Sequence, residues 1–138
     1  MPDDIAAKNC KPAILYVDSE VHNITAFVAM LRREYHIVSA GSAFLGLEIL
    51  QSQHFEIIVS AKNMKEMNGA MFLAKSMATH PCSIRLMVSD YADEDMGQGQ
   101  GRLIHDFLIT PWDQSQVKAI LKKSFADYLL TYKAKNME

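Results

Sequence analysis

The sequence predicts a doubly wound α/β domain, which is a parallel β-sheet with helices on both of its faces. Short apolar runs alternate along the chain with longer segments whose apolar residues recur every three or four positions, a pattern typical of strands alternating with helices. The run Ile-Ile-Val at 57–59 has no polar residue between its members, which indicates a strand buried on both faces. Because strand and helix patterns alternate along the whole chain, one parallel sheet flanked by helices is expected.

The predicted strands are short β-branched or aliphatic runs between polar residues and turn formers. They cover residues 13–17, 36–40, 56–60, 84–88 and 107–109. In open sheets of this class, ligands bind at the carboxyl ends of the strands. Chemistry is therefore expected directly after the central strand, and the first residue there is Ala61.

The predicted helices lie between these strands and after the last one. They cover residues 20–35, 42–50, 69–80 and 113–132. Ser19 and Ser42 are placed to act as N-caps, and Pro81 prevents the third of these helices from continuing. The segment 92–102 holds glycines that alternate with glutamines, and each glycine costs a helix about 1 kcal/mol relative to alanine. A fourth connecting helix is therefore expected to be short, frayed or absent.

The composition indicates one globular domain, since the chain has 138 residues of which 49% are hydrophobic and 22% charged. We divide it into an N-terminal arm (1–11), a domain (12–132) and a tail (133–138). The net charge of -2 gives no electrostatic basis for nucleic-acid binding. No run approaches the ~20 apolar residues of a membrane span, the first residues show no signal-peptide pattern, and the two cysteines lack metal-site spacing. A cytoplasmic protein without membrane contact is expected.

Four motifs resemble those of response-regulator receiver (CheY-like) domains. In chain order they are ILYVDSE, EIIVSAKNMKEMNG, RLMVSDYAD and FLITPWD. The resemblance covers residues 12–130. It implies a five-stranded sheet in the order 2-1-3-4-5 and a cis peptide bond before Pro111.

The resemblance also implies where the chemistry of the family would lie. Receiver domains accept a phosphoryl group on an aspartate after the third strand, and two acids, a hydroxyl and a lysine assist. Here Asp18 matches the first acid and Ser89 the hydroxyl. Ser19 replaces the second acid, Ala61 the phospho-accepting aspartate and Thr110 the lysine.

These replacements predict that the phosphorylation pocket has lost its chemistry. Alanine has no lone pair, so no acyl phosphate can form on Ala61. Asp18 remains as a relic metal ligand or, in the simpler interpretation, as a polar strand end that accepts hydrogen bonds from backbone amides. Ser60 points to the opposite face of the sheet, because side chains alternate along a strand. We expect no metal, no cofactor and no enzymatic activity.

The predicted function is therefore that of a pseudo-receiver, a non-phosphorylatable module in two-component (phosphorelay) signalling that works through protein contacts. A protein partner and a homodimer are expected, both through segment 92–102, the fifth strand and the last helix. The residues assigned to this switch and interaction face are Phe107, Trp112, Val117, Leu121 and Tyr128. Trp112 has a second interpretation, as a cap over the core.

Two alternatives remain open at this point. In the first, the pocket near Asp18, Ala61, Ser89 and Thr110 accepts a small ligand other than phosphate, although no glycine-rich phosphate loop supports this. In the second, the domain is a weakly active phospho-receiver.

Overall fold

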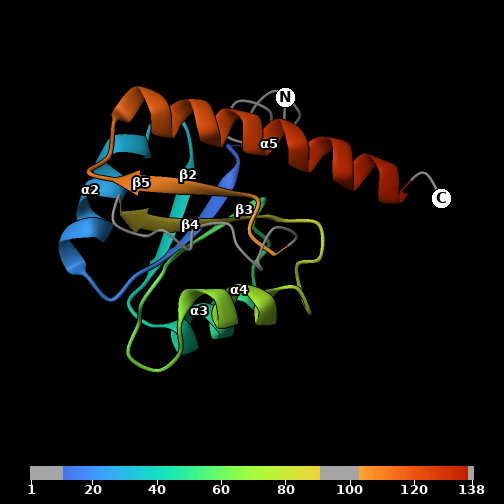
Figure 1. The fold of residues 1–138 in the computed structure, drawn as a ribbon. Coiled ribbons are helices and arrows are strands. Elements are labelled where there is room, and N and C mark those ends of the chain that lie inside the picture. Colours follow the sequence, from blue (N-terminus) through green and yellow to red (C-terminus); the bar gives the residue numbers. More distant parts are fainter. Residues whose placement is uncertain (1–10, 91–102, 137–138) are drawn as a thin grey trace, which may run out of the picture.

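Five parallel strands form a single sheet in the order β2-β1-β3-β4-β5 (Figure 1). The computed structural model describes residues 11–90 and 103–136, and all five strands lie within these ranges. The strands are β1 (Ala13–Val17), β2 (His36–Ala40), β3 (Ile57–Ala61), β4 (Ile84–Asp90) and β5 (Asp106–Thr110). Both the fold class and the strand order confirm the prediction.

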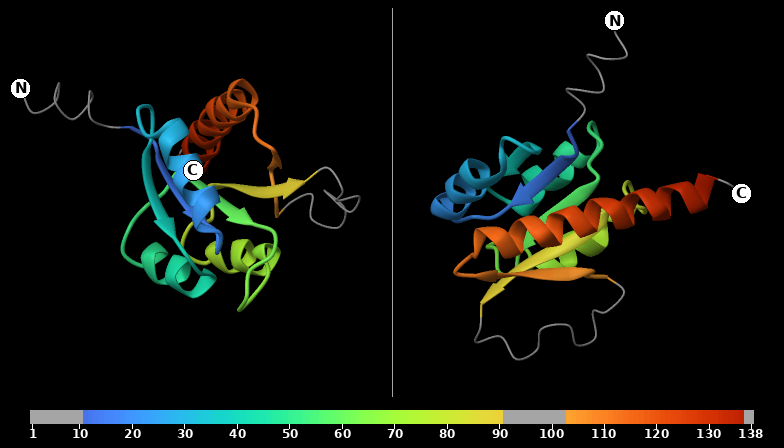
Figure 2. Two further views of the ribbon diagram at one scale, coloured as in Figure 1. Left: turned by 90° about the vertical axis from the view of Figure 1, so that its left-hand side faces the viewer. Right: turned by 90° about the horizontal axis from the view of Figure 1, so that it is seen from above.

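In the described part of the chain, four helices cover the two faces of the sheet. They are α2 (Val21–Leu31), α3 (Ala43–Leu50), α4 (Gly69–Ser76) and α5 (Gln114–Asn136). Helices α3 and α4 lie side by side on one face, and α2 and α5 lie on the other (Figures 1 and 2). The chain is therefore a three-layer α/β domain, and the carboxyl ends of all five strands point to the same edge.

Alternation along the strands divides the core into two clusters. Ile14 and Tyr16 of β1 pack with Phe27 of α2 and with α5, whereas Leu15 and Val17 pack with α3 and α4. Each cluster is built mainly from buried aliphatic and aromatic side chains, and the full burial of one such large side chain contributes about 1.5–3 kcal/mol relative to exposure. The uninterrupted apolar runs of the sequence reflect this burial on both faces.

Local polar contacts start the helices, and one predicted cap is wrong. Ser42 caps α3 as predicted, because its Oγ accepts a hydrogen bond from the amide of Leu45 at 3.1 Å. Ser19 does not cap α2. The N-cap of α2 is Glu20, which makes no side-chain cap bond, and Ser19 is exposed. The carboxylate of Asp18 accepts a hydrogen bond from the backbone amide of Glu20 instead, so the residue after β1 stabilises the start of α2.

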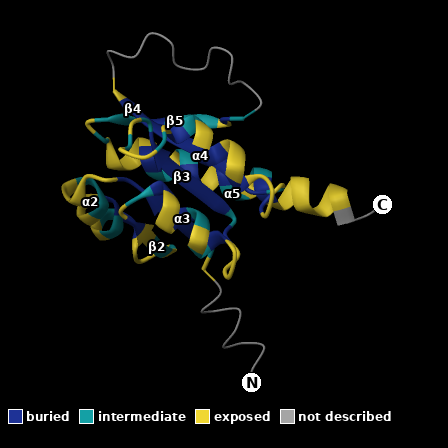
Figure 3. Cartoon of the chain, turned by 90° about the horizontal axis from the view of Figure 1, so that it is seen from below, coloured by how far each residue is buried: buried dark blue, intermediate teal, exposed yellow. Residues whose placement is uncertain are grey.

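Helix α5 is the longest element, with 23 residues, and it extends well past the sheet (Figures 1 and 3). It ends at Asn136, so the predicted tail (133–138) begins as helix. The peptide bond between Thr110 and Pro111 is cis, as the resemblance implied. Within the described ranges, no helix is both long and apolar enough to cross a membrane. The degenerate helix predicted at 92–102 and most of the predicted arm lie outside the described residues.

Candidate functional site

The carboxyl ends of four adjacent strands form the candidate site. The parallel registers of β1 with β3, β3 with β4 and β4 with β5 place the ends of these strands next to one another. They bring together Asp18, Ala61, Ser89 and Thr110, as the sequence predicted. Ser19 follows Asp18 in the chain but is exposed.

Asp18 is buried, with 2% of its surface exposed, and three protein groups donate hydrogen bonds to its carboxylate. The hydroxyl of Tyr16 and Nδ2 of Asn23 both donate to Oδ2, at 2.8 and 3.0 Å. The amide of Glu20 donates to Oδ1 at 2.9 Å. Asp18 therefore has the role given by the simpler interpretation, a strand-end acceptor, and two side-chain donors join the backbone amide.

Tyr16 connects this carboxylate to an aromatic cluster. Its ring stacks on Phe27 with a centroid distance of 4.3 Å, and Trp112 meets both rings edge-on at 6.1 and 5.7 Å. Burial, followed by the charge of Asp18 and the hydrogen bond to it, raises the pKa of Tyr16 far above its ordinary value of 10.0. The hydroxyl thus keeps its proton and remains a donor to Asp18. Trp112 packs against the core as one of its two interpretations predicted.

Ala61 ends β3 with a methyl group, and its neighbour offers no substitute nucleophile. The hydroxyl of Ser60 donates to the carbonyl of Ala61 at 2.9 Å and lies against Gly69 at the start of α4. It therefore points to the α4 face, as strand alternation predicted. Gly69 also donates its amide to the carbonyl of Lys62 at 2.8 Å, which folds the intervening loop back over the end of the strand.

The two remaining positions contact each other through the backbone. The hydroxyl of Thr110 donates to the carbonyl oxygen of Ser89 at 3.2 Å, joining the ends of β4 and β5. Thr110 carries no charge. The position where receiver domains have a lysine therefore holds a neutral hydroxyl that is already hydrogen-bonded.

Comparisons with known proteins agree with this architecture. No protein-family model matches the chain. The transcriptional regulatory protein ZraR of Escherichia coli is 30% identical over 115 residues, which are 82% of this chain and 26% of that protein. The hydrogenase transcriptional regulatory protein HoxA of Bradyrhizobium diazoefficiens is 26% identical over 119 residues, which are 85% of this chain and 24% of that protein. The chain thus spans about a quarter of the length of these relatives.

Solved structures give the same fold. The signal receiver domain of an HD domain-containing protein from Pseudomonas fluorescens aligns with a TM-score of 0.80 and 23% identity, covering 89% of this chain and 93% of that one. The chemotaxis protein CheY4 of Vibrio cholerae aligns with a TM-score of 0.77 and 19% identity, covering 83% and 98%. The chain therefore has the CheY-like fold, with the strand order β2-β1-β3-β4-β5. A structure described as adenylate cyclase from Rhodopirellula baltica aligns with a TM-score of 0.86 and 20% identity, covering 92% of this chain and 96% of that one.

Receiver domains use Mg²⁺ at this position, and the residues present here do not fit it. Mg²⁺ prefers octahedral oxygen ligands and gives up its bound water molecules reluctantly, so it needs accessible carboxylates. Asp18 is buried and already accepts three hydrogen bonds, and Ala61 supplies no oxygen from its side chain. Among the described residues, no group of three His, Cys, Asp or Glu side chains is arranged to hold a metal ion.

The interaction face predicted for this domain needs a correction. Val117, Leu121 and Tyr128 are buried against the sheet and cannot form an interface. They occupy the sheet-facing stripe of α5, because residues three or four apart share one face of a helix. Phe107 and Trp112 are half-buried and also pack against the core.

The exposed apolar residues of α5 lie in its last turns instead. Leu129 is 48% exposed, Leu130 69% and Tyr132 50%. In Figure 3 the part of α5 that extends past the sheet is coloured as exposed. The amphipathic stripe of the sequence contained Leu129 and Tyr132, but its period alone did not separate them from the buried positions.

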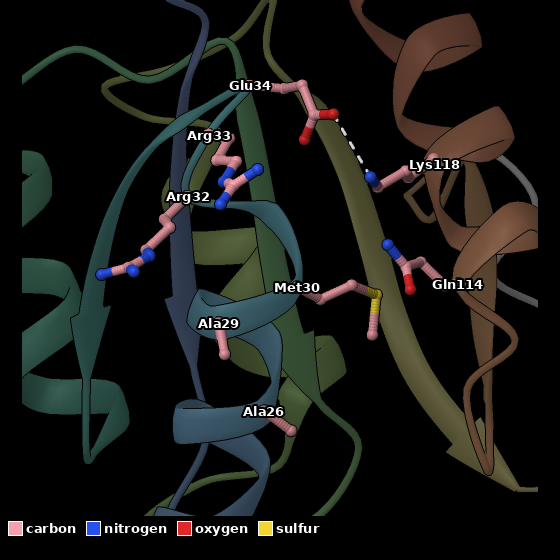
Figure 4. A pocket seen from close by; sticks show the side chains of 8 residues that line it. All are labelled: Ala26, Ala29, Met30, Arg32, Arg33, Glu34, Gln114 and Lys118. Carbon is pink, nitrogen blue, oxygen red and sulfur yellow. Dashed lines mark hydrogen bonds and ion pairs between the residues drawn. The ribbon is translucent and has the colours of Figure 1, made fainter.

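A groove between α2 and α5 was not predicted from the sequence. It has a volume of about 520 Å³. Its lining residues are Ala26, Ala29, Met30, Arg32, Arg33, Glu34, Gln114 and Lys118 (Figure 4). An ion pair of 3.2 Å between Lys118 and Glu34 spans it, and both side chains are well exposed, so it contributes about 1 kcal/mol at most. The strand-end residues do not line this groove.

Proposed function

We propose that this domain is a pseudo-receiver, a receiver domain that takes part in two-component signalling by protein contact and is not phosphorylated at the end of β3. The observation that carries the proposal is Ala61, whose methyl group stands at the position of the phospho-accepting aspartate. It is 8% exposed, so the strand end is closed by packed protein atoms.

The neighbouring residues support the same function. Phosphoryl transfer depends on a nucleophile and on cations that neutralise the charge developing on the phosphoryl oxygens. At these positions the domain has a methyl group, a carboxylate that accepts three hydrogen bonds from protein groups and a neutral threonine hydroxyl. Nothing in this set activates or receives a phosphoryl group, which also argues against a weakly active phospho-receiver and against an enzyme.

A domain that works by protein contact requires a protein partner, and two kinds of partner fit this chain. The curated relatives are about four times as long as the matched segment and are transcriptional regulatory proteins. The partner of this domain is then an effector domain or a separate signalling protein, contacted in the cytoplasm. A second copy is the other partner, joined through the exposed end of α5, which replaces the buried residues of the first prediction.

A small-ligand sensor gains no support from the structure. Ser89, like Asp18 and Ala61, is buried. The nearby pocket at Lys62, Asn63 and Met87 has a volume of about 120 Å³. Pockets that bury drug-sized ligands usually measure about 300–1,000 Å³, so the space is too small for most metabolites.

Incubation with acetyl phosphate and MgCl₂, followed by intact-mass measurement, tests the proposal. The expected result is an unchanged mass under conditions that phosphorylate a receiver domain with the aspartate, which serves as the positive control. A gain of one phosphoryl group on the natural chain, located by peptide mapping to a strand end, would overturn it.

A further inference from the structure

Asp18 is the one acid that this domain shares with the metal site of receiver domains, and its oxygens are already engaged. A carboxylate offers about four lone-pair positions. Three accept hydrogen bonds here, two on Oδ2 from Tyr16 and Asn23 and one on Oδ1 from the Glu20 amide. The remaining position belongs to a side chain that is 2% exposed.

We infer that the hydroxyl of Tyr16 and the side-chain amide of Asn23 take the place of a divalent cation at Asp18, and so prevent a metal ion from binding in the pocket. Both groups point a partially positive hydrogen at Oδ2 of Asp18, so a cation approaching this oxygen would have to compete with them. Hydrogen bonds to an ionised acceptor are about twice as strong as neutral ones, so a cation has to displace two firmly held donors.

The surrounding structure fixes both donor groups in place. The Tyr16 ring is fully buried and packs against both Phe27 and Trp112, so the hydroxyl stays aimed at Asp18. Asn23 lies in the first turn of α2, where its backbone N–H donates to the carbonyl of Glu20 at 3.1 Å. The turn that positions Asn23 therefore begins at the same residue whose amide bonds Asp18.

This closure goes beyond the proposed function, because it concerns metal binding and holds whatever protein the domain contacts. It also has a specific consequence. Restoring the missing carboxylates with Ser19→Asp and Ala61→Asp should not restore a good Mg²⁺ site while Tyr16 and Asn23 still engage Asp18. Metal binding in such a chain should appear only after these two donors are removed.

The experiment compares Mn²⁺ and Mg²⁺ affinities of chains that carry Ser19→Asp and Ala61→Asp. One chain has only these changes, and a second adds Tyr16→Phe and Asn23→Ala. A third adds Tyr35→Phe, which removes the hydroxyl of another tyrosine packed against the same core cluster. Affinity is measured from the electron paramagnetic resonance signal of free Mn²⁺ and from the fluorescence of Trp112, the only tryptophan.

Removing the donors should lower the Kd for Mn²⁺ by roughly tenfold or more, since each 1.4 kcal/mol of lost competition is a factor of ten. The Tyr35→Phe control should match the chain with only the restored acids. If the chain with four substitutions does not fold, Tyr16→Phe alone is added to the restored acids, because phenylalanine retains the ring packing. Equal affinities with and without the donors, or no binding in any folded chain, would overturn the inference.

Discussion

Nε2 of His54 lies 2.9 Å from the hydroxyl oxygen of Tyr128, which connects the segment before β3 to the last helix. The two residues are 74 positions apart in the sequence, and Tyr128 is buried where α5 leaves the sheet. His54 also stacks on His80 with a centroid distance of 5.4 Å. This contact anchors α5 at the edge of the sheet opposite the strand-end site.

The first prediction concerns that anchor. Tyr128→Phe should lower the free energy of unfolding by about 0.5–1.5 kcal/mol, because it removes one hydrogen bond and retains the ring. A double-mutant cycle with His54→Ala, followed by urea denaturation, measures the coupling between the two side chains. Additive effects of the two substitutions would mean that the hydrogen bond contributes nothing to stability.

The second prediction concerns the close packing of the β3–α4 loop. A Cβ atom on Gly69 would collide with the backbone carbonyl of Ala61, and a backbone atom cannot move aside as a flexible side chain can. Gly69→Ala should therefore destabilise the domain by roughly 3 kcal/mol, at the upper end of overpacking effects. Gly41→Ala is the matched control, since a Cβ there meets nothing within 4 Å, and its unfolding midpoint should stay close to that of the natural chain. Similar midpoints for both variants would contradict the prediction.

The third prediction is a loss of stability at low pH. His80 is buried, with Nε2 3.0 Å from the carbonyl oxygen of Gln53 and Nδ1 2.8 Å from the hydroxyl of Thr79. Burial and then the neighbouring His54 lower the pKa of His80 below 6.5, and the hydrogen bond to Gln53 opposes them only in part. The unfolded chain therefore binds this proton at a higher pH than the folded domain does.

Stability should accordingly be complete above about pH 7 and should fall as the pH drops through 6.5 toward the lower pKa of the folded state. Urea denaturation at several pH values between about 7.5 and 5 tests this, and His80→Gln should flatten the profile. Burial also lowers the pKa of His105, so part of the decline should persist in that variant. A profile that His80→Gln leaves unchanged would assign the pH dependence to other groups.

The fourth prediction concerns self-association. Leu130→Glu places a charge on the exposed end of α5 and should convert a dimer to a monomer in multi-angle light scattering, because a buried unpaired charge is costly at an interface. Val21→Glu is the control, since Val21 is similarly exposed, at 68%, but lies on α2. A natural chain that stays monomeric at high micromolar concentration would remove the homodimer from the proposed function.

The sequence predicted the fold well because its signals are local and repeated. Apolar runs and helical periodicity placed all five strands and four helices, and Ser42 acts as the predicted cap. It also predicted that Asp18, Ala61, Ser89 and Thr110 lie together, since parallel strands carry their carboxyl ends to one edge. The sequence alone also shows that the side chain of Ala61 cannot act as a nucleophile, because a methyl group has no lone pair in any fold.

The contacts of the remaining residues follow from how the segments pack in three dimensions. Periodicity assigns Val117, Leu121 and Leu129 to one amphipathic helix, but the length of the sheet beneath that helix decides which of them are buried. In the same way, the acid at position 18 is visible in the chain alone, whereas the packing of Tyr16 and the first turn of α2 set which side chains donate hydrogen bonds to it. The physical reason is that composition and period are properties of a segment, whereas a hydrogen-bond partner and a buried face depend on which segments meet in space.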